Sequence, residues 1–119
     1  MEIMNETIEE ISAKLEAKEI SAVELTKLSL AKIDRTKDLN ILHEVCEEKA
    51  LESAKKIDEK RANGENLPKL AGIPVVIKDN ISKIDTFTTC SSQFLADYKS
   101  PYNATVVDKL IENGAIIIG

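Results

Sequence analysis

One stretch of this 119-residue chain decides its fold: Leu70-Ala71-Gly72-Ile73-Pro74-Val75-Val76-Ile77-Lys78-Asp79-Asn80-Ile81. Its centre is a short apolar run, rich in β-branched residues and bounded by Gly and Pro, which predicts a buried strand over Ile73–Ile77. Lys78 ends this strand and opens a polar loop. A neutral amine held there, partly out of water, can act as a general base for a serine hydroxyl. The ordinary alternative is a strand-end lysine that extends into solvent or pairs with Asp79.

Downstream of the lysine, the sequence predicts a second strand of the same sheet. Residues 79–105 contain eight Ser or Thr and little periodicity, which indicates a polar loop. A helix is expected over Ala104–Asn113, capped by Asn103 and closed by Gly114, followed by a buried strand over Ala115–Ile118. This order predicts an α/β fold with at least partly parallel pairing. A strand this apolar normally has neighbours on both sides, so the mixed sheet is expected to be incomplete.

The preceding part of the chain, residues 1–66, predicts helices packed on this sheet. Two capping-box sequences, Thr7-x-x-Glu10 and Ser21-x-x-Glu24, mark the first two helix starts. The expected elements are a helix over Thr7–Ala17, a helix from Ser21 with Leu25, Leu28 and Ala31 as its apolar stripe, an extended segment near Ile41–Val45 with His43 on a strand face, and a helix over Glu47–Arg61 ended by Asn63-Gly64.

Composition narrows the class of protein. The net charge of −5 and the pI of about 5.0 speak against a nucleic-acid surface within this piece. Residues 1–70 hold 16 of the 21 acids and 12 of the 16 bases, as expected of solvated helices ahead of a more buried region. The apolar runs are too short for a membrane span, and the N-terminus lacks the features of a signal peptide. Two distant cysteines and one histidine form no disulfide framework and no metal motif, so a cytoplasmic protein without a metal site is expected.

The lysine stretch resembles the lysine motif of the amidase signature family. Two further elements follow in the order and spacing of that family: Thr88-Thr89-Cys90-Ser91-Ser92, and Tyr102-Asn103-Ala104-Thr105-Val106-Val107-x-Lys109-Leu110-x-x-x-Gly114-Ala115-x-Ile117-Ile118-Gly119. The resemblance is weak over residues 7–66 and strong over residues 70–119. It implies that residues 1–119 are the N-terminal part of a single amidase-signature domain, helical over 1–66 and strand-loop-helix-strand over 70–119.

The resemblance implies a Ser–cis-Ser–Lys triad in which Lys78 is the catalytic base. The lysine accepts a proton through a serine with a cis peptide bond, and that serine activates a nucleophilic serine. Both serines belong to a Gly/Ser-rich segment downstream of Gly119, so the chain alone is expected to be inactive. Ser91 and Ser92 belong to the Thr-Thr-Cys element and are not these serines.

Within the family, the Thr-Thr-Cys element resembles the A-type glutaminase subunits of tRNA-dependent amidotransferases. Those enzymes are ligases of protein biosynthesis that release ammonia from glutamine and amidate Glu-tRNA(Gln) or Asp-tRNA(Asn). The implied partners are B-type and C-type subunits, glutamine and mischarged tRNA, and the complete complex uses ATP and Mg²⁺ that this piece does not bind. Two alternatives remain: an amide hydrolase of the same family that uses no tRNA, and a short non-catalytic protein that binds a partner through its helices.

Six further residues are candidates for the site. Thr88, Thr89, Cys90 and Ser91 are candidates for a substrate pocket, although hydroxyls in turns and a small packing cysteine would give the same pattern. Asp79 and Asn80 are expected to position the loop by bonding its backbone.

Three positions depart from the family pattern. Asp85 stands where the family usually has Gly, which predicts a residue with positive φ that Asp tolerates better than most. Gln93 replaces a usual Lys. Asn103 replaces a common Asp, a benign change because both residues cap helices well.

Overall fold

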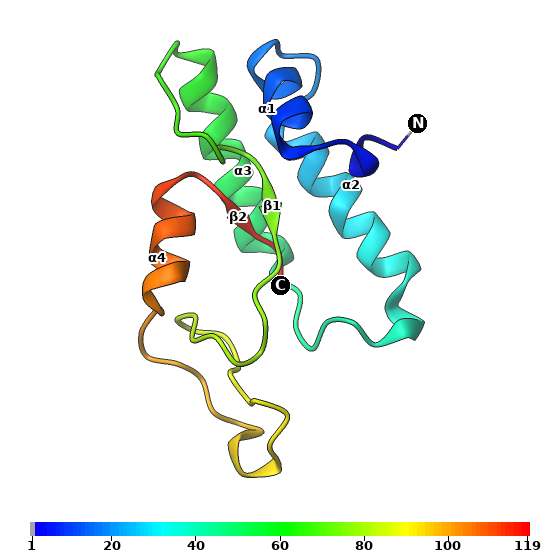
Figure 1. Ribbon diagram of the computed structural model, residues 1–119, viewed down its shortest axis with the longest axis vertical. Coiled ribbons are helices and arrows are strands. Elements are labelled where there is room, and N and C mark those ends of the chain that lie inside the picture. The colour runs from blue at the N-terminus through cyan, green and yellow to red at the C-terminus, as the bar shows by residue number, and fades with distance from the viewer. Residues whose placement is uncertain (1) are drawn as a thin grey trace.

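The computed structural model describes residues 2–119 as an α/β fold, which confirms the predicted class (Figure 1). Four helices and two short strands form its framework, and three 3₁₀ turns connect them. In chain order the elements are η1 (Ile3–Asn5), α1 (Ile8–Glu16), α2 (Ala22–Arg35), η2 (Lys37–Leu39), α3 (Glu47–Ala62), β1 (Pro74–Val75), η3 (Gln93–Leu95), α4 (Thr105–Glu112) and β2 (Ile116–Ile117).

Both predicted capping boxes are present and begin α1 and α2. The Glu10 amide donates to Thr7 Oγ1 at 3.3 Å while the Thr7 amide donates to Glu10 Oε2 at 2.7 Å. The same reciprocal pair joins Ser21 and Glu24 at 3.1 and 2.9 Å. In each box, hydrogen bonds from the capping residue lower the pKa of the glutamate. Each box provides hydrogen-bond acceptors for amides that lack partners within the helix. Because the two capping residues are only three positions apart, both helix starts could be predicted from local sequence.

The two strands pair in parallel, with Pro74 opposite Ile116 and Val75 opposite Ile117. The Ile116 amide donates to the Ile73 carbonyl at 2.8 Å, and the Ile118 amide donates to the Val75 carbonyl at 3.0 Å. The predicted parallel pairing is therefore confirmed, whereas the sheet found in residues 2–119 has two parallel strands and is not mixed. Both strands are shorter than predicted. The ladder is short because the Ile73 amide bonds the Leu70 carbonyl at 2.9 Å before β1, and because the Ile77 amide bonds Gly119 instead of continuing the regular register.

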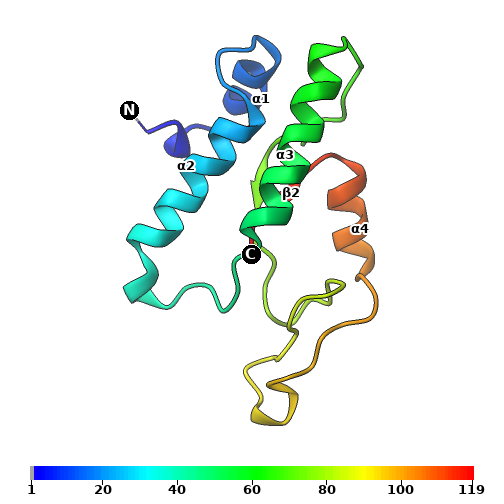
Figure 2. The same cartoon turned by 180° about the vertical axis from the view of Figure 1, so that it is seen from behind.

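The hydrophobic core lies between the sheet and the N-terminal helices. Figure 1 shows β1 and β2 in front of α3, and Figure 2 shows α3 from behind, covering them. Both α2 and α3 contact the strands. Leu15, Leu25 and Ile116 are almost completely buried at this junction. Removing such apolar side chains from water is the main term that holds the helices on the sheet.

A carboxylate of α3 ties the core together. Asp58 accepts hydrogen bonds from the amides of Ala22 at 2.8 Å and Val23 at 3.0 Å, which are the first two residues of α2. Arg61, one turn further along α3, donates to the carbonyl of Ala71 at 3.2 Å. One face of α3 therefore fixes both the start of α2 and the segment that leads into β1.

The core-facing side of α2 differs from the prediction. Leu28 is 46% exposed, and Ala31 is exposed as well. The buried positions besides Leu25 are Ala22, Thr26 and Ser29. Two of these buried residues, Thr26 and Ser29, are polar. The buried side of α2 therefore could not be predicted from the spacing of its apolar residues. The Ser29 hydroxyl is satisfied inside the helix by the Leu25 carbonyl at 3.0 Å.

Two other local predictions were wrong. Residues 41–45 form an irregular loop instead of an extended segment, and its backbone is anchored where the Cys46 amide donates to the Ile118 carbonyl at 2.9 Å. Ala104, and not Asn103, is the N-cap of α4, and it makes no side-chain capping bond. The Asn103 side chain is used elsewhere, because its Oδ1 accepts from the Ile84 amide at 2.7 Å.

Residues 82–103 form a lobe that projects from the body, drawn from yellow-green to orange in Figure 1. Two isolated bridges close it, Ile84 with Ser100 and Phe87 with Lys99. Across the described residues 2–119, none of the helices has the length and apolar character needed to cross a membrane.

Candidate functional site

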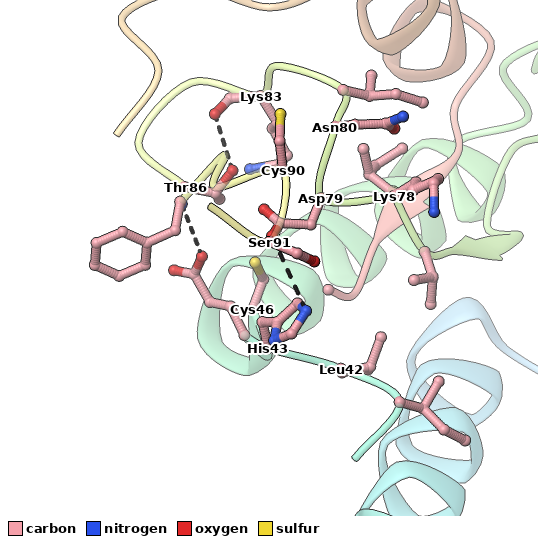
Figure 3. A pocket seen from close by; sticks show the side chains of 17 residues that line it. Leu42, His43, Cys46, Lys78, Asp79, Asn80, Lys83, Thr86, Cys90 and Ser91 are labelled. Carbon is pink, nitrogen blue, oxygen red and sulfur yellow. Dashed lines mark hydrogen bonds and ion pairs between the residues drawn. The ribbon is translucent and has the colours of Figure 1, made fainter. Parts of the chain in front are cut away.

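A cavity of about 490 Å³ opens at the carboxyl ends of the two parallel strands. Lys78 follows β1 and Gly119 follows β2, and both residues line it. The loop before α3 and the loop after β1 supply the remaining walls (Figure 3). Parallel α/β sheets characteristically bind ligands at this end of their strands. The position therefore marks the cavity as the candidate site.

Lys78 stands at the rim of the cavity. Its backbone is held by the bond of the preceding residue, Ile77, to the Gly119 carbonyl at 2.9 Å. The side chain is exposed, which agrees with the alternative of a strand-end lysine that extends into solvent and not with an amine held partly out of water. Among residues 2–119 no carboxylate forms an ion pair with it, so the alternative of a pair with Asp79 is not observed. Within residues 2–119, the Lys78 amine therefore lies at the cavity without an acidic partner.

Asp79 points away from Lys78 and binds Thr89. The Thr89 amide donates to Asp79 Oδ1 at 2.7 Å, and the Thr89 hydroxyl donates to Asp79 Oδ2. The Cys90 amide donates to the Asp79 main-chain carbonyl at 3.0 Å. Burial raises the pKa of the Asp79 carboxyl, but the hydrogen bonds from Thr89 and the nearby His43 outweigh burial and leave the pKa below its ordinary value.

The bound segment is a tight turn over Thr89–Ser92. The Ser92 amide donates to the Thr89 carbonyl at 2.8 Å. The two central residues, Cys90 and Ser91, have φ of 51° and 56°. Left-handed conformation at both central positions is the pattern of a type I′ turn, which normally selects Gly, Asn or Asp. Here a cysteine and a serine occupy these positions.

The four predicted pocket residues divide into two pairs. Cys90 and Ser91 line the cavity, whereas Thr88 and Thr89 are not among the residues that line it. Thr88 is only 5% exposed, and its hydroxyl finds no hydrogen-bond partner among residues 2–119. Asn80 lines the cavity, and the structure shows no side-chain hydrogen bond from it within the same range.

Sequence reasoning missed the wall contributed by the loop before α3. His43 is an exposed loop residue, and its Nε2 lies 4.0 Å from Asp79 Oδ2. The Glu44 carboxylate accepts from the Phe87 amide at 3.0 Å. Cys46 lines the same cavity. More than thirty residues separate this loop from residues 78–91, and no motif signals the contact.

Asp85 has φ of 62°, as predicted for a position that the family usually gives to Gly. Its amide donates to the Ser100 carbonyl at 3.1 Å, and its carboxylate lies 3.9 Å from Lys49 on α3. The departure from Gly is therefore accommodated within the bridge that closes the lobe.

The residues that line the cavity include two lysines, two cysteines, two hydroxyl residues, two carboxylates and one histidine: Lys78, Lys83, Cys46, Cys90, Thr86, Ser91, Glu44, Asp79 and His43. In the described part of the chain, no three His, Cys, Asp or Glu side chains are grouped so as to hold a metal ion. No hydroxyl or thiol of the cavity is hydrogen-bonded to Lys78 or His43 within residues 2–119. An acyl-transfer site would need a nucleophile brought to Lys78 by other residues.

Comparison with known sequences gives a consistent relationship. Residues 24–119 match the family described as Amidase. The chain is 48% identical over its whole length to the A-type subunit of glutamyl-tRNA(Gln) amidotransferase from Thermoanaerobacter pseudethanolicus, covering 24% of that protein. It is 41% identical over 98% of its length to the mitochondrial A-type subunit of the same amidotransferase from Homo sapiens, covering 22% of that protein. The chain thus spans about a quarter of the length of these relatives.

Solved structures share the fold. An amidase family protein from Bacillus anthracis superposes with a TM-score of 0.87 at 32% identity, over 99% of this chain and 24% of that one. The peptide amidase of Stenotrophomonas maltophilia superposes with a TM-score of 0.89 at 28% identity, over 97% of this chain and 24% of that one.

Proposed function

Since this chain belongs to the Amidase family, we propose that it forms the N-terminal part of the glutaminase subunit of a tRNA-dependent amidotransferase. In this role it contributes to the release of ammonia from glutamine, which converts Glu-tRNA(Gln) or Asp-tRNA(Asn) to the amidated form. Support comes from its relatives, because identity to the A-type amidotransferase subunits reaches 48%, whereas the two amidase structures described above are 32% and 28% identical. Residues 1–119 would then be one part of a single amidase-signature domain.

The observation that carries the proposal is the position of Lys78. Its amine lies at the carboxyl end of β1 and at the rim of the cavity, and within residues 2–119 it forms no ion pair with a carboxylate. In the proposed mechanism the Lys78 amine accepts a proton through one serine from a second, nucleophilic serine. That serine attacks the side-chain amide carbon of glutamine, the proton held by Lys78 passes back to the amide nitrogen, and the C–N bond breaks to release ammonia. Water then hydrolyses the glutamyl-serine ester that remains, which releases glutamate and restores the serine.

Both serines lie outside residues 1–119 in this proposal, so the chain supplies the base and part of the pocket wall. Cys90 and Ser91 line that wall. The proposal also includes B-type and C-type partner subunits, mischarged tRNA bound through the complex, a cytoplasmic location, and ATP with Mg²⁺ used elsewhere in the complex.

A second candidate is an amide hydrolase that acts without tRNA. The observation that favours it is the close superposition on a peptide amidase, with a TM-score of 0.89. The two candidates differ in what becomes of the ammonia. An amidotransferase delivers it to the activated acceptor tRNA, whereas a hydrolase releases it from free or peptide amides.

The test uses the full-length protein with its partner subunits. Ammonia release from glutamine and ATP-dependent amidation of Glu-tRNA(Gln) and Asp-tRNA(Asn) are measured together. Lys78→Ala is expected to lower glutamine hydrolysis by about 10²–10⁴-fold or more. Lys78→Arg should be similarly impaired because a guanidinium does not release its proton at working pH. Lys109→Ala, which removes an exposed lysine of α4, is the matched control.

Retention of turnover by Lys78→Arg would rule out Lys78 as the base. Wild-type hydrolysis of peptide amides, with no tRNA product, would favour the second candidate.

A further inference from the structure

The turn over Thr89–Ser92 is held in an unfavourable conformation at the edge of the cavity. Cys90 and Ser91 are consecutive non-glycine residues with φ of 51° and 56°. Side chains with a Cβ atom disfavour this region, and such conformations persist where surrounding contacts impose them. Both residues line the cavity that contains Lys78. The contacts that impose this conformation come from Asp79.

Asp79 holds the turn through both its carboxylate and its main chain. The carboxylate accepts from the Thr89 amide at 2.7 Å and from the Thr89 hydroxyl, while the Asp79 carbonyl accepts from the Cys90 amide at 3.0 Å. The hydroxyl has a single proton, and it is donated to Asp79. Its oxygen is therefore free to accept from the Ser91 amide at 3.2 Å. Asp79 thus holds Thr89 and Cys90 directly, and it holds Ser91 through the Thr89 hydroxyl.

The location of that aspartate links the turn to the base. Asp79 directly follows Lys78, whose backbone is fixed to β2 by the bond from Ile77 to Gly119. Figure 3 shows Asp79 directed toward the turn and Lys78 directed away from it. The separation between the lysine and the turn is therefore set by the backbone of two adjacent residues, without a contact between their side chains.

We propose that Asp79 and Thr89 form a clamp that positions the Cys90–Ser91 turn as a substrate-facing wall opposite Lys78. Asp79 is a positioning residue in this scheme, since it acts through Thr89 and makes no contact with the lysine amine. The inference rests on the proposed function for the identity of the substrate, but not for the geometry of the turn. The lowered pKa of Asp79 agrees with a carboxylate kept ionised by these donors.

The test is a double-mutant cycle in the full-length enzyme with its partner subunits. Asp79→Ala removes the carboxylate, and Thr89→Val removes the hydroxyl while keeping the shape of the side chain. Each change is expected to lower kcat/KM for glutamine by about 10²-fold, the effect of a displacement on the order of 1 Å. The double variant should be no worse than the poorer single variant, because both changes break one unit. Thr89→Ser should stay within a few-fold of wild type.

A second measurement reports on the turn itself. Hydrogen exchange of the Cys90 and Ser91 amides should accelerate in Asp79→Ala and Thr89→Val but not in Thr89→Ser. Thr36→Val is the matched control. It removes a hydroxyl that does not line the cavity and that donates to the Lys32 carbonyl at a distance of 2.8 Å. It should leave both kcat/KM and the exchange of the turn amides unchanged.

Additive losses in the cycle would overturn the clamp, as would lost activity with unchanged exchange at Cys90 and Ser91. If Asp79→Ala does not fold, Thr89→Val and Thr89→Ser still test the clamp. Equal kcat/KM and equal exchange of the Cys90 and Ser91 amides in these two variants would overturn it. If the wild-type enzyme hydrolyses another amide in place of glutamine, the proposed function fails and the cycle is measured on that amide.

Discussion

Replacing Gly114 by alanine tests how the fold brings the two strands into register. Gly114 ends α4 with φ of +83° and leads directly into β2. A Cβ atom at this position would lie 2.7 Å from the Ala71 Cα and 3.0 Å from its Cβ. The Gly114 carbonyl also accepts from the Gly72 amide at 3.0 Å. The backbone before β1 and the backbone before β2 therefore meet here with no space for a side chain.

Two separate effects set the loss of unfolding free energy expected for Gly114→Ala. A left-handed conformation costs a residue with Cβ about 1–2 kcal/mol. Overpacking against backbone adds about 1–3 kcal/mol, because the Ala71 main chain cannot move without breaking its own bonds. The expected loss of unfolding free energy for Gly114→Ala is therefore about 2–5 kcal/mol. Gly64 has φ of +75° but nothing within 4 Å of the Cβ position. Gly64→Ala should thus cost about 1 kcal/mol, since only the first effect applies.

Urea unfolding of the full-length protein and of both variants, followed by circular dichroism and by protease susceptibility, measures the difference. The expected order is wild type, Gly64→Ala, then Gly114→Ala. Equal losses for the two variants would refute the close approach of residues 71 and 114. A Gly114→Ala loss below that of Gly64→Ala would contradict the reasoning entirely.

Three other outcomes are expected. Asp58→Ala removes the carboxylate that caps α2 and should lower the unfolding free energy by about 2–3 kcal/mol. Asp34→Ala removes an exposed ion pair with Lys37 and should change the unfolding free energy by at most about 0.5 kcal/mol. Comparable effects of the two variants in urea unfolding would contradict the capping role of Asp58. The folded-state pKa of Asp79 is lowered, so its contribution to stability is present above the ordinary carboxyl range and is lost as pH falls through the lowered value. Asp79→Asn should therefore flatten acid unfolding curves in that range, and an unchanged profile would exclude the effect. The 119-residue chain alone should release no ammonia from glutamine above a heat-killed control. It should also be helical by far-UV circular dichroism yet loosely packed, and a sharp cooperative melt from a monomer would contradict the loose packing.

Local sequence predicted those features that depend on neighbours along the chain. The capping boxes at Thr7 and Ser21 are set within a few residues, and the structure contains both. The positive φ at Asp85 was predicted from the resemblance, because the family usually has Gly at this position, and the structure has it as well. The parallel pairing followed from two apolar runs separated by a helix. Asn103 shows the limit, because a good capping residue next to a helix start is used by a distant amide, that of Ile84.

The sequence by itself determined the order of the four helices and the two paired strands and placed a lysine after a strand, because helix caps, β-branched runs and turn residues act over short distances. Only the tertiary structure decided which side of α2 faces the core, that His43 lies 4.0 Å from Asp79, and that Asp79 holds Thr89 rather than Lys78. These relations depend on which groups come within hydrogen-bonding distance once helices and strands are packed. A polar side chain has several possible partners in sequence, and packing leaves it only those that lie within about 3 Å.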